Sequence, residues 1–178
     1  MAATERVYES LSELAEYAKK FSPMRIVIEP FDREAHKKGL IGPTDEAAAL
    51  IRRLRQRYPE SGMSWDSSHA ALNGEDLIQS LDIGKQEIVH MHFANPVVDK
   101  TRPDYGDYHI ALGPPGLLRM ETVGEILRHA QKLGILGKQR IGVGVEYRTQ
   151  PGGDPWATEA VGRNILETAW KLATEPEA

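Results

Sequence analysis

The feature that most constrains the fold is a regular alternation of helical segments with short apolar runs rich in β-branched residues. The apolar runs occupy residues 24–29, 62–66, 87–94 and 141–146. Helical spacing of apolar residues covers about residues 4–21, 45–58, 75–81, 121–133 and 156–172. The order α-βα-βα-βα-βα predicts parallel strands joined by right-handed crossovers. It fits either an open doubly wound sheet or a (β/α) barrel.

Composition and charge narrow the class of protein. With 178 residues the chain is long enough for one domain with its own core, and we expect a single domain over residues 1–178. The net charge of −4 argues against a nucleic-acid partner, and the lack of cysteine rules out disulfides and thiolate ligands. The N-terminus is unlike a signal peptide, and no apolar stretch approaches the ~20 residues of a membrane span. We therefore expect a cytoplasmic protein that does not contact membranes.

Potential metal ligands lie at or near the end of every apolar run. Glu29, Asp66 and Glu146 each end a run, and the run at residues 87–94 contains His92. Because the C-terminal ends of parallel strands share one face, we expect these side chains to meet there. Three carboxylates and an imidazole suit Mn²⁺, Mg²⁺, Co²⁺ or Zn²⁺, and a cation would offset the repulsion among the acids. The pattern therefore predicts a divalent-metal site.

The run at residues 87–94 contains two histidines with different expected roles. His90 and His92 point to the same side of the strand because side chains alternate, whereas Met91 and Phe93 face the helices. His92 lies nearer the C-terminal end and is the expected metal ligand. His90 lies one layer deeper and is expected to be a hydrogen-bonded core residue.

The remaining histidines are expected in loops or on a helix. His69 lies in a predicted loop after Asp66, and His109 lies in a predicted long loop over residues 95–120. Both can reach the strand-end face from these positions. His36, in the loop after the first strand, and His129, on a helix, are interpreted as solvated, although His36 also lies on the strand-end side.

Five segments resemble, in order and spacing, the xylose isomerase-like superfamily of (β/α)8 TIM barrels. They are IVIEPFDR around Glu29, SWDSSHAAL around Asp66, IVHMHFAN around His92, GDYHIALGPPG after it and GVGVEYR around Glu146. The resemblance implies that the chain corresponds to the last four βα units, strands 5 to 8, with the preceding helix. A complete barrel needs eight strands and about 250 residues, so the N-terminal half is expected to be missing from this chain.

The resemblance also implies an activity. Ketose 3-epimerases and related sugar isomerases of this superfamily hold Mn²⁺ or a similar ion, and their ligand pattern corresponds to Glu29, Asp66, His92 and Glu146. In those epimerases the two glutamates also exchange a proton with the substrate carbon beside a carbonyl, through an enediolate stabilised by the metal. We therefore expect a metal-dependent sugar isomerase or epimerase whose catalytic residues are Glu29 and Glu146, with Mn²⁺ as the first choice of ion.

The substrate contacts implied by the resemblance are less complete. A histidine three residues after the ligand aspartate contacts substrate in the epimerases, which corresponds to His69. Their second substrate-binding glutamate is replaced here by Ala35, and their substrate arginine is replaced by Val98. Neighbouring polar residues are expected to take these places; they are His36, Lys100 and Arg102.

Two alternative functions remain open at this stage. Endonuclease IV relatives share the fold and bind further zinc ions, which makes His69, Asp107 and His109 a possible second metal site. The chain could also be a non-catalytic half-barrel that depends on a partner. Open strand edges and the inward residues Val27, His90 and Val143 would otherwise meet water. We therefore expect either that the chain is a fragment of a longer protein, or that a homo-oligomer or a partner chain completes the barrel.

Overall fold

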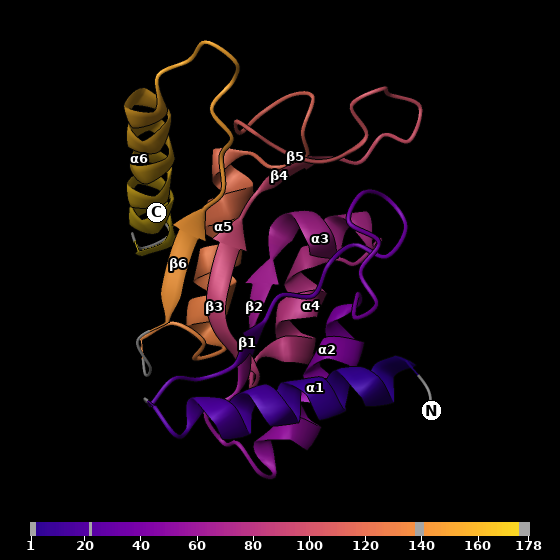
Figure 1. The fold of residues 1–178 in the computed structure, drawn as a ribbon. Helices are drawn as coiled ribbons and strands as arrows, with labels where there is room; N and C mark the ends of the chain where they lie inside the picture. The colour runs from indigo at the N-terminus through magenta and orange to yellow at the C-terminus, as the bar shows by residue number, and fades with distance from the viewer. Residues whose placement is uncertain (1–2, 22, 138–140, 175–178) are drawn as a thin grey trace.

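The structure, a computed structural model, describes residues 3–21, 23–137 and 141–174. Its centre is a parallel sheet with the strand order β1-β2-β3-β6 (Figure 1). The strands are β1 (Val27–Ile28), β2 (Gly62–Asp66), β3 (Ile88–Phe93) and β6 (Gly142–Val145). Because they all run in one direction, their C-terminal ends lie together at one end of the sheet. The parallel α/β architecture predicted from the sequence is confirmed.

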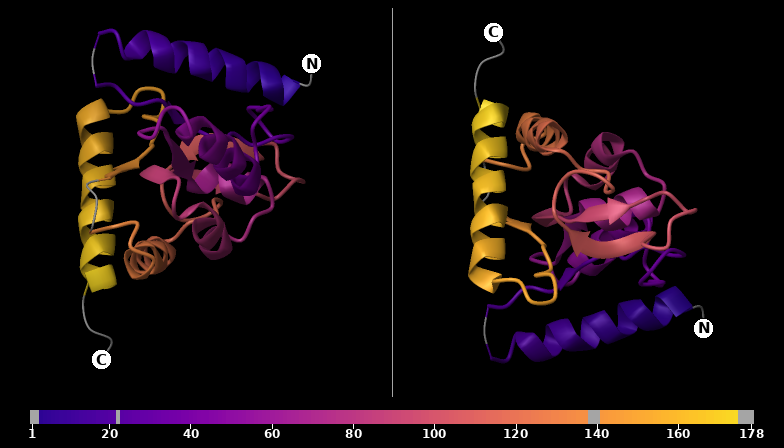
Figure 2. Two further views of the ribbon diagram at one scale, coloured as in Figure 1. Left: turned by 90° about the horizontal axis from the view of Figure 1, so that it is seen from below. Right: turned by 90° about the horizontal axis from the view of Figure 1, so that it is seen from above.

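Helices form a layer against this sheet. They are α1 (Ala3–Ala18), α2 (Thr44–Arg55), α3 (Ser67–Leu72), α4 (Leu77–Gly84), α5 (Met120–Lys132) and α6 (Pro155–Thr174). α2 packs on α4, α4 on α5 and α5 on α6, while α1 packs on α2 near the N-terminal ends of the strands. Figure 2 shows α1 and α6 on two different sides of the fold. None of the described helices is long and apolar enough to cross a membrane.

The hydrophobic core lies between the sheet and the helices. Trp65 of β2 and Phe93 of β3 are buried there, with ring centroids 6.1 Å apart. They belong to one apolar cluster with Ile51 of α2, Leu81 of α4 and Leu127 of α5. Burying each such side chain stabilises the fold by about 1.5–3 kcal/mol, so this layer holds the strands in register.

The opposite face of the sheet carries small and polar side chains. In the parallel register Ser64 lies beside His90, and His90 lies beside Gly142. Ser64 Oγ is 3.2 Å from His90 Nδ1. A Cβ atom at residue 142 would lie 2.4 Å from Cδ2 of His90, so glycine leaves room for the ring. His90 is therefore a hydrogen-bonded residue below the strand ends, as expected, but it is partly buried rather than part of the core.

The prediction that Val143 faces the barrel interior is wrong. Val143 is paired with Met91, a residue buried in the helix-facing core, and it lines a pocket with Leu127 of α5 and Leu166 of α6. Its neighbours Gly142 and Gly144 occupy the inner face instead. The alternation of side chains along this strand is one residue out of step with the prediction, and such a shift assigns a side chain to the opposite face of the sheet.

Three segments differ from the predicted elements. The apolar run 24–29 contributes only the two-residue strand β1. The segment after Asp66 is helix α3 rather than a loop, because the Asp66 carboxylate accepts hydrogen bonds from the backbone of Ser68 and His69. The long loop at 95–120 contains an antiparallel hairpin, formed by β4 (Asn95–Val97) and β5 (Gly106–Ile110).

The end of this hairpin is fixed by a buried amide side chain. Asn95 donates hydrogen bonds from Nδ2 to the carbonyl oxygens of Ala111 and Gly113, at 2.7 and 3.1 Å. Its Oδ1 atom accepts a hydrogen bond of 2.7 Å from the backbone of Leu118. The hairpin therefore rises from the C-terminal end of β3 and brings Asp107 and His109 to the same end of the sheet as the predicted metal ligands (Figure 1).

Candidate metal centre

Four side chains from four segments meet at the C-terminal ends of the strands. Each of Glu29, Asp66, His92 and Glu146 offers one ligand atom, and these atoms all lie within 4.8 Å of one another. Nδ1 of His92 is 3.0 Å from Oε1 of Glu29 and 2.8 Å from Oε1 of Glu146. The structure therefore brings together all the residues that the sequence singled out as metal ligands.

Asp66 is the most buried member of this group, and half of its carboxylate lacks a hydrogen bond. Its Oδ1 atom caps α3 by accepting from the backbone N–H groups of Ser68 and His69, at 2.7 and 3.0 Å. Its Oδ2 atom is buried and has no hydrogen-bond partner among the described residues. Burial raises the pKa of Asp66 to about 8, against the effect of the hydrogen bond from the His69 backbone. An unpaired oxygen of this kind is costly unless a cation binds it.

His92 balances the charge of the two glutamates. Its hydrogen bonds with Glu146 and then with Glu29 raise the pKa of His92 to about 10. The hydrogen bond from His92 in turn lowers the pKa of Glu146. Without a metal, a protonated imidazole thus supplies the positive charge between the carboxylates. A divalent ion would replace that proton and leave the imidazole nitrogen free to bind it.

The donor set fits a divalent cation. Ligand atoms lie about 2.0–2.3 Å from ions such as Zn²⁺, Mg²⁺ or Mn²⁺, so two ligands across one ion are separated by about 4–4.6 Å. The observed separations, all within 4.8 Å, are compatible with that spacing. Three carboxylates and one imidazole match hard or borderline ions and do not select one of them.

A second cluster surrounds Asp107, whose side chain is fully buried. Its Oδ1 atom accepts a hydrogen bond of 2.8 Å from Ser68 Oγ. Its Oδ2 atom is 3.2 Å from Nε2 of His109, 3.7 Å from Nζ of Lys37 and 3.8 Å from Nε2 of His69. Burial raises the pKa of Asp107, but hydrogen bonds from His109 and Ser68 outweigh it and bring the pKa to about 2. Asp107 is therefore an anion beside two imidazoles.

His109 joins the two clusters. Its Nε2 atom faces Asp107, and its Nδ1 atom is 3.3 Å from Oε2 of Glu146. The residue has a positive φ of 52°, in the left-handed region that asparagine, aspartate and histidine adopt more often than other non-glycine residues. The hydrogen bond with Asp107 raises the pKa of His109. The residues of the possible second metal site therefore surround one oxygen atom, Oδ2 of Asp107. Among the described residues, the ligand atoms that all lie within 4.8 Å of one another are those of the first site.

The expected substrate contacts are placed at different distances from these clusters. His69 is buried and adjoins Asp107. His36 is exposed and stacks on Tyr108, with ring centroids 4.8 Å apart, which places it beside the hairpin. Lys100 and Arg102 lie in the exposed turn between β4 and β5, where Arg102 forms bidentate hydrogen bonds with Asp104. Their roles stay predictions.

Sequence reasoning missed Asp32 and Tyr108. Asp32 follows Glu29 by three residues and is fully buried, with its Oδ2 atom 3.1 Å from Nδ1 of His69. Asp32 lies in a polar loop after the first strand, which is the usual sequence context of an exposed acidic residue. No local pattern therefore distinguishes it. Tyr108 lies between Asp107 and His109, and only the hairpin geometry shows that it meets His36.

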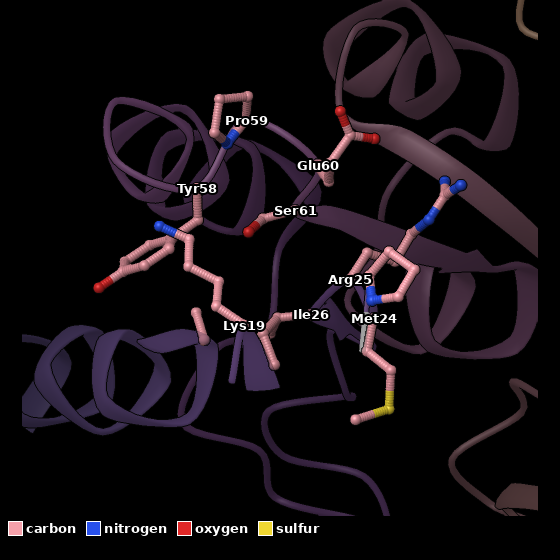
Figure 3. Close-up of a pocket in the computed structure, with 10 residues that line it drawn as sticks. Lys19, Met24, Arg25, Ile26, Tyr58, Pro59, Glu60 and Ser61 are labelled. Carbon is pink, nitrogen blue, oxygen red and sulfur yellow. The ribbon is translucent and has the colours of Figure 1, made fainter. Parts of the chain in front are cut away.

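A separate pocket of about 500 Å³ lies at the other end of the sheet (Figure 3). It is lined by α1, by the segment that leads into β1 and by the turn before β2; its residues include Lys19, Met24, Ile26 and Tyr58. The members of the two carboxylate and histidine clusters do not line it. The pocket therefore has no part in the candidate metal centre.

Metal binding is expected to release protons and to strengthen steeply with pH. Below the pKa of about 8, Asp66 holds a proton in the metal-free protein, and His92 holds one below about 10. A metal ion displaces both, so affinity should rise by about two orders of magnitude per pH unit below pH 8 and by about one between pH 8 and 10. Titration calorimetry at pH 7 in buffers of different ionisation enthalpy measures this release directly. Release of fewer than one proton per ion would contradict the expectation.

Comparisons with known proteins agree with the geometry. The profile of the xylose isomerase-like TIM barrel family matches residues 2–161. No curated protein matches the chain. Among solved structures, L-ribulose 3-epimerase is 13% identical with a TM-score of 0.71, and the match covers 96% of this chain and 55% of that one. The 3-keto-D-glucoside 4-epimerase YcjR from E. coli is 19% identical with a TM-score of 0.64, and the match covers 92% of this chain and 53% of that one.

A third structure is that of the IOLI protein with a bound zinc atom. It is 18% identical with a TM-score of 0.57, and the match covers 97% of this chain and 56% of that one. At these identities the structures show the fold, and the chain spans about half the length of each of them. The sheet with its helix layer therefore corresponds to part of a (β/α) barrel, as the sequence predicted.

Proposed function

Because the chain belongs to the xylose isomerase-like TIM barrel family, we propose that Glu29, Asp66, His92 and Glu146 bind a divalent metal ion at the centre of a sugar isomerase or epimerase site. The observation that carries the proposal is the convergence of these ligand atoms within 4.8 Å, with a buried unpaired oxygen on Asp66. The bound ion would supply positive charge to a substrate carbonyl oxygen.

In the proposed reaction the two glutamates move the proton. Glu29 follows β1 and Glu146 follows β6, the strands at opposite edges of the sheet, and both contact Nδ1 of His92. One carboxylate would remove the proton from the carbon beside the carbonyl, and the electron pair would move to the carbonyl oxygen. The other would return a proton to the opposite face of that carbon, which inverts its configuration without net oxidation or reduction.

The second cluster would bind the rest of the substrate. The Asp107 carboxylate is a buried acceptor beside the proposed metal centre, and His69 lies next to it. Hydroxyl groups of a polyol can donate to such acceptors, which favours a sugar or a similar hydroxylated ketone. Two of the similar solved structures are named as sugar epimerases, which supports the same class of substrate. The chain spans about half of their length, so these contacts would be part of the set that a whole barrel offers.

A metal-dependent hydrolase of the same fold is the second candidate. The observation that favours it is the grouping of His69 and His109 around the buried oxygen of Asp107, which could hold an additional ion. Metal analysis distinguishes the two functions, since the isomerase needs one ion per chain and the hydrolase needs more.

The proposal predicts hydrogen exchange at the substrate carbon. Incubated in D₂O with Mn²⁺ and a panel of ketoses and aldoses, the protein should incorporate deuterium beside the carbonyl of at least one sugar. Glu29→Gln and Glu146→Gln should lower this exchange by about 100-fold or more, the usual range for loss of a general acid or base. The assay is mass spectrometry, with metal content measured for each variant.

A control histidine lies in the helix layer. His129 of α5 pairs with Asp82 at 3.3 Å and lies outside both clusters, so His129→Ala should exchange at the wild-type rate. If metal-loaded protein catalyses no exchange with any sugar while hydrolysing a phosphodiester or an abasic-site substrate, the hydrolase is the better assignment. If it does neither, the chain is a non-catalytic half-barrel on its own.

A further inference from the structure

The loop between β1 and α2 contains a buried carboxylate that belongs to neither proposed cluster. Asp32 is 0% exposed, although its neighbours Arg33 and Glu34 are exposed. Its Oδ1 atom accepts hydrogen bonds from the backbone N–H groups of His36 and Lys37. Its own carbonyl oxygen accepts a hydrogen bond of 2.9 Å from the backbone of Gly39. Asp32 therefore holds the loop in a closed turn.

The other oxygen of the same carboxylate holds a histidine on a different element. Oδ2 of Asp32 is 3.1 Å from Nδ1 of His69, which lies in α3. The ring of Phe31 packs edge-on against His69, with centroids 4.8 Å apart. The backbone of His69 is tied to Asp66 by a hydrogen bond of 3.0 Å. The imidazole is thus fixed from three directions, and rotation about its side-chain bonds would break the contact with Asp32.

These contacts decide which nitrogen of His69 faces the site. Nδ1 is turned toward Asp32, so Nε2 is the nitrogen that lies 3.8 Å from Oδ2 of Asp107. The backbone N–H of Asp32 is also directed at Nδ1 as a donor, at the longer distance of 3.3 Å, and this competing contact would need a lone pair on Nδ1. A hydrogen bond to a carboxylate is stronger than one between neutral groups, so the carboxylate determines where the imidazole proton resides. The proton then lies on Nδ1 and Nε2 has a free lone pair.

We propose that Asp32 is a positioning residue that fixes His69 with its proton on Nδ1, so that Nε2 accepts a hydrogen bond from a hydroxyl group held beside Asp107. The same carboxylate orders the turn that carries His36 and Lys37, and Lys37 in turn lies 3.7 Å from Asp107. The loop and the imidazole are therefore set by one buried group. The substrate contact rests on the proposed function, whereas the proton position and the loop order do not.

The test uses asparagine in place of the carboxylate. In Asp32→Asn, the amide oxygen can still accept from the loop backbone, so the amide NH₂ group turns toward His69 and donates to Nδ1. The imidazole proton must then move to Nε2. Long-range ¹H–¹⁵N correlation spectra of ¹⁵N-labelled, Zn²⁺-loaded protein distinguish the two forms, and His69→Gln assigns the signal. The expected result is the Nδ1–H form in wild type and the Nε2–H form in the variant.

A matched control separates this role from ordinary capping. Asp76 also accepts two backbone N–H groups through Oδ1, from Ile78 and Gln79, at the start of α4. Asp76→Asn should leave the His69 spectrum unchanged. An Nε2–H form in wild type, or an unchanged His69 signal in Asp32→Asn, would overturn the proposal. These spectra need no substrate, so a failed turnover assay leaves their outcome intact.

A second variant covers the case in which Asp32→Asn does not fold. Serine at this position can accept from the loop backbone but is too short to reach His69, so Asp32→Ser should keep the turn and release the imidazole. The expected result is loss of the single Nδ1–H form, with metal stoichiometry at the Glu29 and His92 centre unchanged. Retention of the Nδ1–H form in Asp32→Ser would show that another group sets the proton position.

Discussion

Replacing His92 with alanine is expected to weaken metal binding by about two to three orders of magnitude. Structural zinc sites contribute about 10–16 kcal/mol through roughly four ligands, so one ligand accounts for about 2.5–4 kcal/mol. His92 contacts both glutamates at 2.8 and 3.0 Å, so its loss also removes the group that holds them together. Titration calorimetry with Mn²⁺ and Zn²⁺ at pH 8 measures the change. The proposed metal centre is wrong if His92→Ala binds either ion as tightly as wild type.

Asp66→Asn offers a sharper version of the same test because it keeps the helix cap. Asparagine can accept the hydrogen bonds from Ser68 and His69, but it removes the buried charge and the ligand oxygen. Metal-dependent thermal stabilisation, which follows from binding to the folded state alone, should disappear in this variant. His129→Ala, which changes a histidine paired with Asp82 outside the centre, should retain the full stabilisation.

Without metal, raising the pH should destabilise the wild-type protein more than Asp66→Asn. Burial raises the pKa of Asp66 from 3.8 to about 8, so the folded state binds the proton more tightly than the unfolded state. That contribution to stability is complete below about pH 4 and is lost as the pH rises through 8. Wild type without metal should therefore lose more stability than Asp66→Asn between pH 6 and pH 9. Equal losses in thermal melts would show that Asp66 is not held protonated.

The fold class and the convergence of the four candidate ligands could be predicted from sequence because both depend on short-range patterns. β-Branched runs at regular spacing give parallel strands, and the C-terminal ends of parallel strands share one face, so an acid or histidine at each end is enough to predict the cluster. His90 and His92 show the same logic, since alternation alone places them on one side and Met91 on the other. These inferences needed no long-range information.

The rest depended on contacts between distant residues. Val143 was placed on the wrong face because the four-residue strand β6 has glycines at every second position, which hides the alternation. The hairpin at 95–110 is stabilised by Asn95, whose partners lie at Ala111, Gly113 and Leu118. Asp32 was missed because its partner is His69, and nothing in the local sequence marks a buried acid in a polar loop.

The second large expected effect is association of the isolated chain. Within the described residues, β1 pairs only with β2 and β6 only with β3, so each leaves one edge without a strand partner. Val27, on the inner face of β1, is 40% exposed. A closed barrel interior is filled by side chains from all eight strands, so these surfaces are suited to contact a further sheet. We expect the 178-residue chain to form dimers or larger assemblies rather than a stable monomer.

Exposed apolar side chains of α1 and of the segment that leads into β1 mark the region where association is expected. The rings of Tyr17 and Phe21 meet at a tilt of 48°, with centroids 4.8 Å apart, and are 62% and 66% exposed. Met24, in the segment that leads into β1, is 60% exposed. Met24 also lines the pocket of about 500 Å³ beneath α1 (Figure 3). Charged substitutions here, Tyr17→Lys and Met24→Lys, should weaken association by at least about tenfold, because buried aromatic and apolar residues dominate interface energies.

Sedimentation velocity at several protein concentrations measures this association. Ile83→Lys is the matched control, because Ile83 is 46% exposed but lies on α4 in the helix layer, so its replacement should leave the assembly unchanged. If the inner face and the strand edges form the contact surface, dissociation should also increase the rate of hydrogen exchange at the backbone amide of Val27. A monodisperse 19.8 kDa monomer that unfolds cooperatively at every concentration would refute the expectation, and would mean that four strands and their helices suffice as a folding unit.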